Sequence, residues 1–429
     1  MADNVTFYKE KEFKDTEIGK IPKEWEVVKL GEIASDIYYG ITAKAVNAET
    51  KLKMLRTTDI KNYKVNWNAL PFCKITEKRE DIERFLLNKG DLMISRAGTI
   101  GISVLVDRDF ENVVFGSYLI KVRLSNQIFP NFMYYFFQSR SYWDHITSGQ
   151  SGSTLKNISL PILKSLKVPI PPLPEQQQIA LILSTIDEAI QKTDEVTAKT
   201  ERLKKGMMNK LLTKGIGHKE FKDTEIGRIP KEWEVKKITD LFEIVTGTTP
   251  STKDNRYWKN GTVVWITPSD MSKLGGKIYI NDSERRITER ALREVNLTLM
   301  PVGSIILSTR APIGYVTIIA SPATFNQGCK GLIPTRSQLL PEFFAYYLLK
   351  KKPFLESLSG GSTFKELSKD ALGSISLPHP KFPEQQQIAS ILSTMDEKLE
   401  LLRKEKAKLV RVKGGFMKEL LTGKIRVKS

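Results

Sequence analysis

The chain repeats two of its own segments almost unchanged, and this duplication limits its folds more than any other feature. Residues 11–29 read KEFKDTEIGKIPKEWEVVK and residues 219–237 read KEFKDTEIGRIPKEWEVKK, so 17 of 19 positions agree at an offset of 208. Residues 174–188 (PEQQQIALILSTIDE) and 383–397 (PEQQQIASILSTMDE) agree at 13 of 15 positions at an offset of 209. Each half of the chain therefore carries one copy of a common framework.

Between the framework segments the two halves have diverged, although short similarities remain. Residues 95–101 (SRAGTIG) parallel 309–314 (TRAPIG), and residues 152–156 (GSTLK) parallel 361–365 (GSTFK). The offsets of such pairs lie between 207 and 214, which small insertions within one shared fold would explain. Short apolar runs, and aromatic-rich segments that begin after a proline, predict strands and helices in each variable part. The predicted fold class is α/β (α+β), formed twice.

A heptad spacing of apolar residues follows each PEQQQ segment and predicts a helix of about 40 residues, or about 60 Å. In the first helix the predicted seam positions are Ile179, Ile182, Ile186, Ala189, Thr193, Val196, Thr200, Leu203 and Met207. In the second they are Ile388, Ile391, Met395, Lys398, Leu402, Glu405, Leu409, Val412 and Phe416. Lys398 and Glu405 make this second seam imperfect, and the flanking Leu392, Leu399 and Leu420 could widen the apolar stripe. Two stripes of equal length favour an antiparallel coiled coil of the two helices. The alternative is that each helix packs separately on its own domain.

These patterns predict two globular mixed α/β domains, separated by the two long helices, with an internal pseudo-two-fold repeat. The second framework block follows the first helix directly, so the C-terminal helix should end beside residues 11–29 and the chain termini should be neighbours. The predicted boundaries are 1–172 for the first domain, 173–214 for the first helix, 215–381 for the second domain, 382–424 for the second helix and 425–429 for a C-terminal tail.

No residue pattern for catalysis, metal binding or cofactor binding is found in the sequence. The three histidines, His145, His218 and His379, have no metal-ligand spacing, and Cys73 and Cys329 are the only cysteines. Phosphate-binding glycine loops and the G-x-S-x-G nucleophile motif are absent. No apolar run reaches the roughly 18 to 20 residues that cross a bilayer, and the amino terminus lacks the apolar core of a signal peptide. We therefore expect a cytoplasmic protein without a catalytic centre of its own and without a membrane partner.

The chain is strongly basic, with 67 Lys and Arg against 49 Asp and Glu, a formal net charge of +18. Residues 1–173 carry +5 and residues 215–382 carry +7, so both variable parts share the excess. Lysine and arginine neutralise phosphates, and side chains that reach base edges add specificity. The charge favours a polyanion as partner, with nucleic acid first, although a charged solvated face alone is a common alternative.

Two loops rich in small polar, basic and aromatic residues are candidates for DNA contact, at 38–44 and at 246–258. Ordinary surface loops are the alternative interpretation. Because Arg96 and Arg310 recur in both halves, they suit the shared fold or a phosphate better than base discrimination. The candidate DNA-binding residues are Tyr38, Tyr39, Thr42, Lys44, Arg56, Arg96, Thr248, Thr249, Ser251, Lys253, Arg256 and Arg310.

The framework segments resemble those of the specificity (S) subunits of Type I restriction–modification systems, over essentially the whole chain. The segments that carry the resemblance are the helix starts 173–180 and 382–389, the G-x-I-P-x-x-W-E-V segments 19–27 and 227–235, and the helix ends 210–213 and 420–427. The resemblance implies two target recognition domains, each of which reads one half of an asymmetric bipartite site in double-stranded DNA. It also implies partners: two modification subunits, which methylate adenine with S-adenosylmethionine, and restriction subunits that use ATP and Mg.

Two other classes of function are considered beside this one. A free-standing nuclease or methyltransferase would show activity of the purified chain alone. A scaffold or repressor would bind DNA without a modification subunit.

Overall fold

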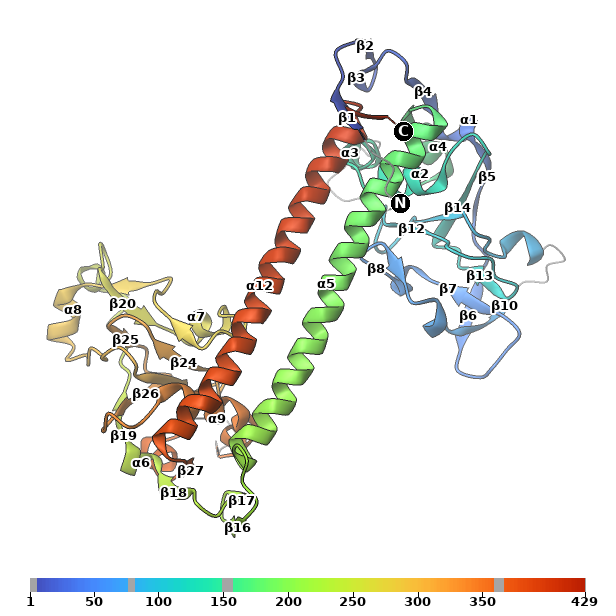
Figure 1. Cartoon of the computed structure of the whole chain (residues 1–429). Helices are drawn as coiled ribbons and strands as arrows, with labels where there is room; N and C mark the ends of the chain where they lie inside the picture. The colour runs from blue at the N-terminus through green and yellow to red at the C-terminus, as the bar shows by residue number, and fades with distance from the viewer. Residues whose placement is uncertain (1–5, 76–81, 149–156, 359–365, 429) are drawn as a thin grey trace. The chain divides into compact units, whose positions relative to one another are not determined.

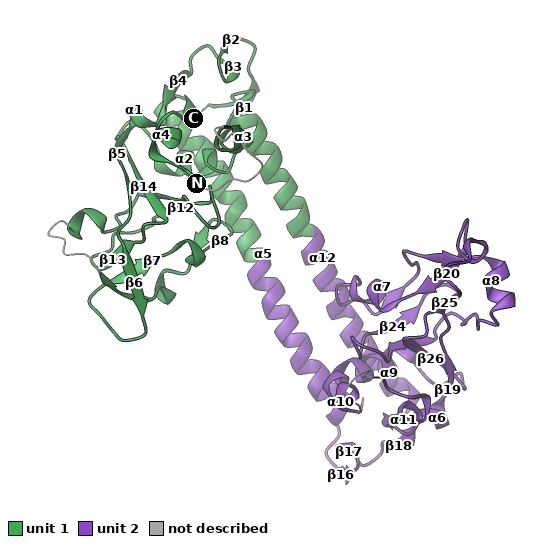
Figure 2. Ribbon diagram, turned by 180° about the vertical axis from the view of Figure 1, so that it is seen from behind, with its two compact units in different colours: residues 1–193, 405–429 green, residues 194–404 purple. Residues whose placement is uncertain are grey.

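The computed structural model describes residues 6–75, 82–148, 157–358 and 366–428, so the GSTLK and GSTFK segments lie outside the described residues. The chain divides into two compact units, residues 1–193 with 405–429 (unit 1) and residues 194–404 (unit 2) (Figure 2). Two long helices, α5 (Leu173–Lys214) and α12 (Phe382–Leu420), contribute one part to each unit.

Unit 1 contains two four-stranded sheets. One sheet is antiparallel, in the order β12–β11–β14–β5, and the other has the order β13–β7–β10–β6 with β13 parallel to β7. The strands are β1 (Thr6–Lys9), β2 (Phe13–Thr16), β3 (Gly19–Pro22), β4 (Glu26–Lys29), β5 (Ala34–Tyr39), β6 (Ala43–Val46), β7 (Lys53–Leu55), β8 (Ile60–Lys61), β9 (Lys64–Val65), β10 (Phe72–Ile75), β11 (Leu92–Ser95), β12 (Ser103–Leu105), β13 (Val113–Phe115), β14 (Leu119–Leu124), β15 (Lys167–Ile170) and β28 (Ile425–Lys428). The helices are α1 (Leu30–Ile33), α2 (Pro130–Phe136), α3 (Arg140–Ser148) and α4 (Leu160–Lys164), with 3₁₀ turns η1 (Thr57–Asp59), η2 (Trp67–Ala69) and η3 (Ile82–Phe85).

Unit 2 repeats this plan with a five-stranded sheet, β19–β26–β23–β24–β21, and a three-stranded sheet, β22–β20–β25. The strands are β16 (Phe221–Thr224), β17 (Gly227–Pro230), β18 (Glu234–Lys237), β19 (Phe242–Thr246), β20 (Val263–Ile266), β21 (Tyr279–Ile280), β22 (Arg286–Ile287), β23 (Ile305–Ser308), β24 (Val316–Ile319), β25 (Ala323–Phe325), β26 (Cys329–Pro334) and β27 (Ser376–His379). The helices are α6 (Ile238–Leu241), α7 (Pro268–Ser272), α8 (Glu289–Glu294), α9 (Pro341–Lys350), α10 (Lys352–Ser357) and α11 (Lys369–Gly373), with the 3₁₀ turn η4 (Asn255–Tyr257).

The two units share their central strands and the helix that follows them, although their sheets differ at the edges. Strands β5, β14, β11 and β12 of unit 1 correspond in order and direction to β19, β26, β23 and β24 of unit 2, and the parallel pair β7–β13 corresponds to β20–β25. Central strands β11 and β23 are fully buried because their sequences, LMIS and IILS, are almost continuously apolar. Helices α2 and α9 both begin at a proline, where its missing N–H costs no hydrogen bond. The predicted mixed α/β class and the internal repeat are confirmed.

The two long helices run antiparallel, as the sequence predicts. In unit 1 the Lys413 Nζ lies 2.8 Å from Asp187 Oδ1, and in unit 2 the Lys204 ammonium contacts Asp396. Residue numbers therefore fall along one helix as they rise along the other (Figure 1).

The predicted seam of the second helix is wrong in one of its two columns. Lys398, Glu405 and Val412 are exposed, and Leu399 is buried in their place. Leu203 of the first helix is exposed as well, whereas Thr193 and Thr200 are buried as predicted. Leu392 and Leu399 are buried and Lys406 and Lys413 half-buried, each one residue after the predicted position. One of the two columns of the predicted seam is therefore displaced by one residue along its whole length, while the other, from Ile388 to Phe416, is kept.

The C-terminal helix ends at Leu420, four residues before the predicted end. Gly423 adopts a positive φ of 69°, and the amide of Lys424 donates to the Glu419 carbonyl (3.0 Å), which closes the last turn. The predicted tail is then a strand, β28, which pairs antiparallel with β1 so that Thr6 lies opposite Lys428. This pairing confirms that the chain termini are neighbours. No described helix is both long and apolar enough to cross a membrane.

Candidate nucleic-acid interface

The first residues of α5 connect the framework of unit 1. The buried Glu175 carboxylate accepts hydrogen bonds from Trp25 Nε1 (3.1 Å) and from Arg426 Nε (2.7 Å) and Nη2 (2.9 Å). The Arg426 guanidinium also donates to Glu10 Oε2 (2.6 Å) and Glu24 Oε2 (2.8 Å). One arginine from the C-terminal strand thus holds three carboxylates from three segments, a charge-assisted arrangement stronger than neutral hydrogen bonds.

We call the cluster of Glu175, Trp25 and Arg426 the joint of unit 1. Unit 2 has an equivalent joint around Glu384, with different hydrogen-bond donors. Glu384, at the place of Glu175, accepts hydrogen bonds from Trp233 Nε1 (2.8 Å), from the backbone amide of Ile216 (3.0 Å) and from the His218 ring at 2.9 Å. His218 and Ile216 follow the end of α5 directly. The repeated tryptophan and glutamate therefore serve the framework.

The glutamine after each of these glutamates holds a helix of the adjoining α/β domain. Gln176 accepts from the amide of Phe129 (2.8 Å), the residue that caps α2, and donates to the Pro171 carbonyl (2.9 Å). Gln385 accepts from the amide of Leu340 (2.9 Å), which caps α9, and donates to the Pro380 carbonyl. Both glutamines are buried, so their hydrogen bonds fix each domain against its long helix.

A second contact repeats between domain and helices. In unit 1 the Tyr135 hydroxyl donates to Asp187 Oδ2 (3.0 Å), and Lys413 lies 5.2 Å from the centre of the tyrosine ring. In unit 2 the Tyr346 hydroxyl donates to Asp396 Oδ2 (2.6 Å), and Lys204 lies 5.4 Å from that ring. Each group joins a domain helix to both long helices.

Tyr38 and Tyr39 lie at the end of strand β5 and not on the predicted loop, and both side chains make contacts within the domain. The Tyr38 hydroxyl donates to the Arg84 carbonyl, its ring packs on Phe85 and Phe115, and burial raises the pKa of Tyr38 to about 12. The Tyr39 hydroxyl accepts from the Leu160 amide (3.1 Å). Both tyrosines therefore have structural roles that the sequence did not show.

The arginines of unit 1 are partly engaged too. Arg56 forms a two-point contact with Asp59 (2.7 and 3.0 Å), which raises the pKa of this arginine. Arg96 stacks 4.1 Å above the ring of Tyr39 and donates to Asn157 Oδ1 (2.9 Å). These contacts set the direction of each guanidinium.

A lysine cluster on one sheet of unit 1 extends the candidate surface. Lys44 on β6 lies directly opposite Lys74 on β10, both are exposed, and Lys53 on β7 lies on the same face, opposite Phe72. Thr42, also exposed, precedes this ladder. Like charges directly opposite in a sheet destabilise it, and within the described ranges no carboxylate lies within salt-bridge distance of the three lysines. The cluster suits an anionic partner.

Sequence reasoning found Lys44 and missed Lys53 and Lys74, because only the strand register brings the three together.

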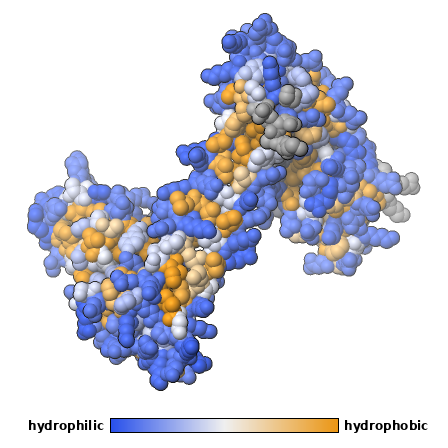
Figure 3. Space-filling view, viewed as in Figure 1, coloured by the Kyte–Doolittle hydropathy of each residue, from blue (hydrophilic) through white to orange (hydrophobic). Residues whose placement is uncertain are grey.

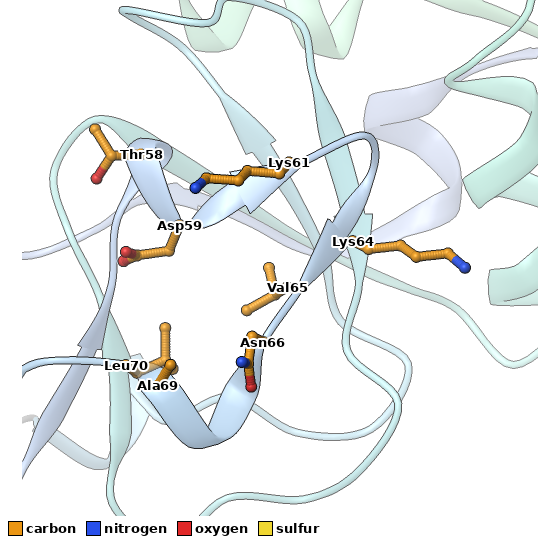
Figure 4. A pocket seen from close by; sticks show the side chains of 8 residues that line it. All are labelled: Thr58, Asp59, Lys61, Lys64, Val65, Asn66, Ala69 and Leu70. Atoms are coloured by element: carbon orange, nitrogen blue, oxygen red, sulfur yellow. The ribbon is translucent and has the colours of Figure 1, made fainter. Parts of the chain in front are cut away.

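A cavity of about 470 Å³ lies in the same domain (Figure 4). Figure 4 shows Lys61 extending toward Thr58, while Lys64 points away and donates to Gln191 Oε1 on α5 (2.9 Å). The residues that line the cavity are Thr58, Asp59, Lys61, Lys64, Val65, Asn66, Ala69 and Leu70.

In unit 2 the candidate loop holds two tryptophans through its backbone. The Thr248 carbonyl accepts from Trp265 Nε1 (3.1 Å), and the Ser251 carbonyl accepts from Trp258 Nε1 (2.9 Å). The Thr249 hydroxyl accepts a hydrogen bond of 3.4 Å from the Gln327 amide. The side chains of Ser251 and Lys253 are exposed at the loop surface.

The remaining candidates of unit 2 are paired with acids. The Arg256 guanidinium contacts Asp254 at 2.6 Å and holds the pKa of that carboxyl at about 2. Arg310 donates to Glu366 Oε2 (2.8 Å), and its backbone amide donates to the Gly328 carbonyl (3.2 Å), next to Phe325 and Gln327, which bind the backbone of Thr248 and the hydroxyl of Thr249. Arg96 and Arg310 thus both engage residues of their own domain, although with different partners.

The histidines and cysteines have structural surroundings. His145 contacts the Ile162 carbonyl (3.1 Å), and burial lowers the pKa of His379. Cys73 and Cys329 are buried, and burial raises the pKa of Cys329 to about 12. Among the described residues, no group of three or more His, Cys, Asp or Glu is placed to hold a metal ion.

The surface in Figure 3 is predominantly hydrophilic on both units, with hydrophobic residues in smaller groups. Together with the lysine cluster and the aromatic loop of unit 2, the arrangement suits a polar, anionic partner and offers no cluster for bond-breaking chemistry within the described residues.

Comparison with known proteins agrees with this geometry. The family profile "Type I restriction modification DNA specificity domain" matches residues 22–201 and again residues 230–411, one match in each half. A relative of Methanocaldococcus jannaschii, provisionally named the type I restriction enzyme MjaX specificity subunit, is 36% identical, with 99% of each chain covered. The MjaVIII specificity subunit of the same organism is 30% identical, with 99% of this chain and 98% of that protein covered.

A crystal structure of a type I restriction–modification S subunit from M. genitalium has the same fold, with a TM-score of 0.57, 17% identity and coverage of 92% of this chain and 96% of that one. The segments matched by the profile contain both PEQQQ repeats, 174–188 and 383–397, and the ends of the other repeated segment, 22–29 and 230–237. The chain therefore belongs to the family of type I restriction–modification DNA specificity subunits, with one specificity domain in each half.

Proposed function

We propose that this chain selects the DNA sequence on which a type I restriction–modification complex acts, and that it supplies no catalytic residue itself. The observation that carries the proposal is the repeat: two nearly identical frameworks hold two basic domains that have diverged. Reading two different half-sites requires such divergence, whereas binding two identical partners requires the framework to stay the same.

In this proposal residues 1–172 and 215–381 are the two target recognition domains, and each binds one half of an asymmetric bipartite site in double-stranded DNA. The long helices set the distance between the half-sites and dock two modification subunits, which methylate adenine with S-adenosylmethionine. Restriction subunits that use ATP and Mg complete the nuclease.

The contact residues in unit 1 are Thr42, Lys44 and Arg96, joined by Lys53 and Lys74. Exposed lysines supply phosphate contacts that weaken with salt. In unit 2 the surface around Thr249, Ser251 and Lys253 takes the same part, and Arg256, which is paired with Asp254, supports it. Tyr38, Tyr39 and Arg56 support this surface from within, since their polar atoms are already engaged.

Methylation mapping after co-expression with modification subunits tests the proposal. The test variant is a chain whose residues 30–172 are replaced by those of a relative, with both frameworks kept, and the original chain is the control. We expect the exchange to change one half-site and leave the other and the spacer unchanged. A change in both half-sites would refute the assignment of one domain to each half-site. DNA binding without any methylation would instead favour a repressor.

A further inference from the structure

We infer that Arg285 reads a guanine base in the half-site of unit 2, and that Trp258 holds it ready to do so. The inference rests on the proposed function and names a residue that the candidate loop itself does not contain. The Trp258 and Trp265 rings pack edge to face, with their centroids 5.0 Å apart and their planes at 84°.

The two tryptophans are fixed by the candidate loop. Their indole N–H groups donate to the Ser251 and Thr248 carbonyls, at 2.9 and 3.1 Å. Trp265 is buried, while Trp258 lies half-buried above it. The loop therefore presents a rigid aromatic face at the surface of unit 2.

Arg285 lies on this face. Its guanidinium carbon is 3.8 Å from the centre of the Trp258 ring and 5.3 Å from that of Trp265. The Arg285 carbonyl also accepts from the Ser283 hydroxyl (2.7 Å), which holds the backbone. Stacking of this kind limits the freedom of a long side chain and so lowers the entropy lost when it binds.

The hydrogen-bond donors of Arg285 are left for a ligand. Among the described residues no acceptor is within hydrogen-bonding distance of its guanidinium. Its neighbours differ: Arg286 donates to Asp282 Oδ1 (2.8 Å), Arg290 to Glu294 Oε1 (2.7 Å), and Arg256 to Asp254. An exposed arginine stacked on tryptophan, with five free donors, contrasts with arginines neutralised by acids.

Guanine is the ligand that this geometry favours. Its O6 and N7 accept two parallel hydrogen bonds from the planar edge of an arginine, which is the commonest specific contact in the major groove. A fixed guanidinium plane selects a coplanar pair of acceptors, whereas a flexible lysine suffices for a phosphate charge. The role of Arg285 is therefore base discrimination, with Trp258 as a positioning residue.

The test uses the full chain with its modification subunits and a DNA library randomised over both half-sites. R285A and R285K should each reduce discrimination at one position of one half-site by about 5- to 150-fold, while preferences in the other half-site stay unchanged. Lysine should not restore discrimination, because it cannot form the paired contact. W258F, which keeps an aromatic face but loses the bond to Ser251, should show a smaller loss at the same position.

R290A is the matched control: it removes an exposed arginine of the same unit that is paired with Glu294, and it should leave every preference unchanged. Uniform weakening over all sequences, with a shallower salt dependence and recovery by R285K, would show a phosphate contact and overturn the inference. Unchanged discrimination in R285A would overturn it as well. If the unmodified chain directs no bipartite methylation, the proposed function fails, and that outcome is distinct from both.

Discussion

The joints of the two units place the same tryptophan and glutamate at the start of a long helix but complete them differently. In unit 1 the third member is Arg426, which arrives on the C-terminal strand and also binds Glu10 and Glu24. In unit 2 it is His218, which follows α5 within one continuous chain and binds Glu384 alone among the carboxylates. In unit 2 the chain runs from α5 directly into the joint, and one imidazole completes the contact with the glutamate. In unit 1 the strands β1 and β28 come from opposite ends of the sequence, and one guanidinium that binds three carboxylates holds them to α5.

Removal of Arg426 should have the largest effect. The R426A substitution leaves two nearly buried carboxylates, Glu175 and Glu10, without their cation, and we expect unit 1 to lose about 3–5 kcal/mol of unfolding free energy. Hydrogen exchange of the whole chain would locate the loss in β1, β28 and the start of α5. The matched variant H218A should cost unit 2 less, about 1–3 kcal/mol, because one hydrogen bond to an acid is lost. Equal losses would contradict the difference between the joints.

The contacts of Tyr135 with Asp187 and of Tyr346 with Asp396 should respond alike, since their geometry is the same in both units. In D187N and D396N the asparagine keeps an acceptor for the tyrosine hydroxyl but loses the ion pair with lysine. We expect about 1–2 kcal/mol of destabilisation in the unit that carries the change. Hydrogen exchange of α2 and α9 would measure it. A loss in one unit only would show that the units differ beyond their joints.

The last effect is absent at neutral pH and appears only above about pH 8. Burial lowers the pKa of Lys121 on β14 to about 8, although Asp91 opposes the shift. Between pH 8 and about 10.5 the unfolded chain binds a proton that the folded chain has lost, so this group makes stability rise with pH there. The rise should be about 1.4 kcal/mol for each pH unit in this interval, or on the order of 3 kcal/mol across it. Urea unfolding at several pH values should show it in the original chain and not in K121M; parallel curves would rule it out.

Much of the fold could be predicted from the sequence because the framework is written twice. The repeat alone predicts two equivalent domains, antiparallel helices and neighbouring termini, and the structure has all three. The buried Leu392, Leu399 and Leu420 could be predicted as additions to the seam because they are apolar. The half-buried Lys406 and Lys413 could not, because both side chains are charged. The helix end was missed because the left-handed turn at Gly423 depends on backbone contacts.

The candidate contacts were predictable only in part. Composition indicated the loop at Thr248. Arg285, which stacks on Trp258, lies outside that loop, and no periodic pattern in the sequence connects the two residues. Tyr38 and Arg56 resemble contact residues in sequence, while their hydrogen bonds lie within the domain. Trp25 and Glu175 could be predicted to have a structural role in both halves, because both lie in segments that the chain repeats nearly unchanged.

The facing lysines at positions 44 and 74 have a consequence for how the protein responds to its solvent. Dissolved salt weakens the repulsion between two exposed ammonium groups and also weakens their attraction for phosphate. Rising ionic strength should therefore make this sheet of the free protein more resistant to unfolding while it releases DNA from the same surface. For this part of the molecule, the conditions that best preserve the isolated protein are those in which it binds DNA most weakly.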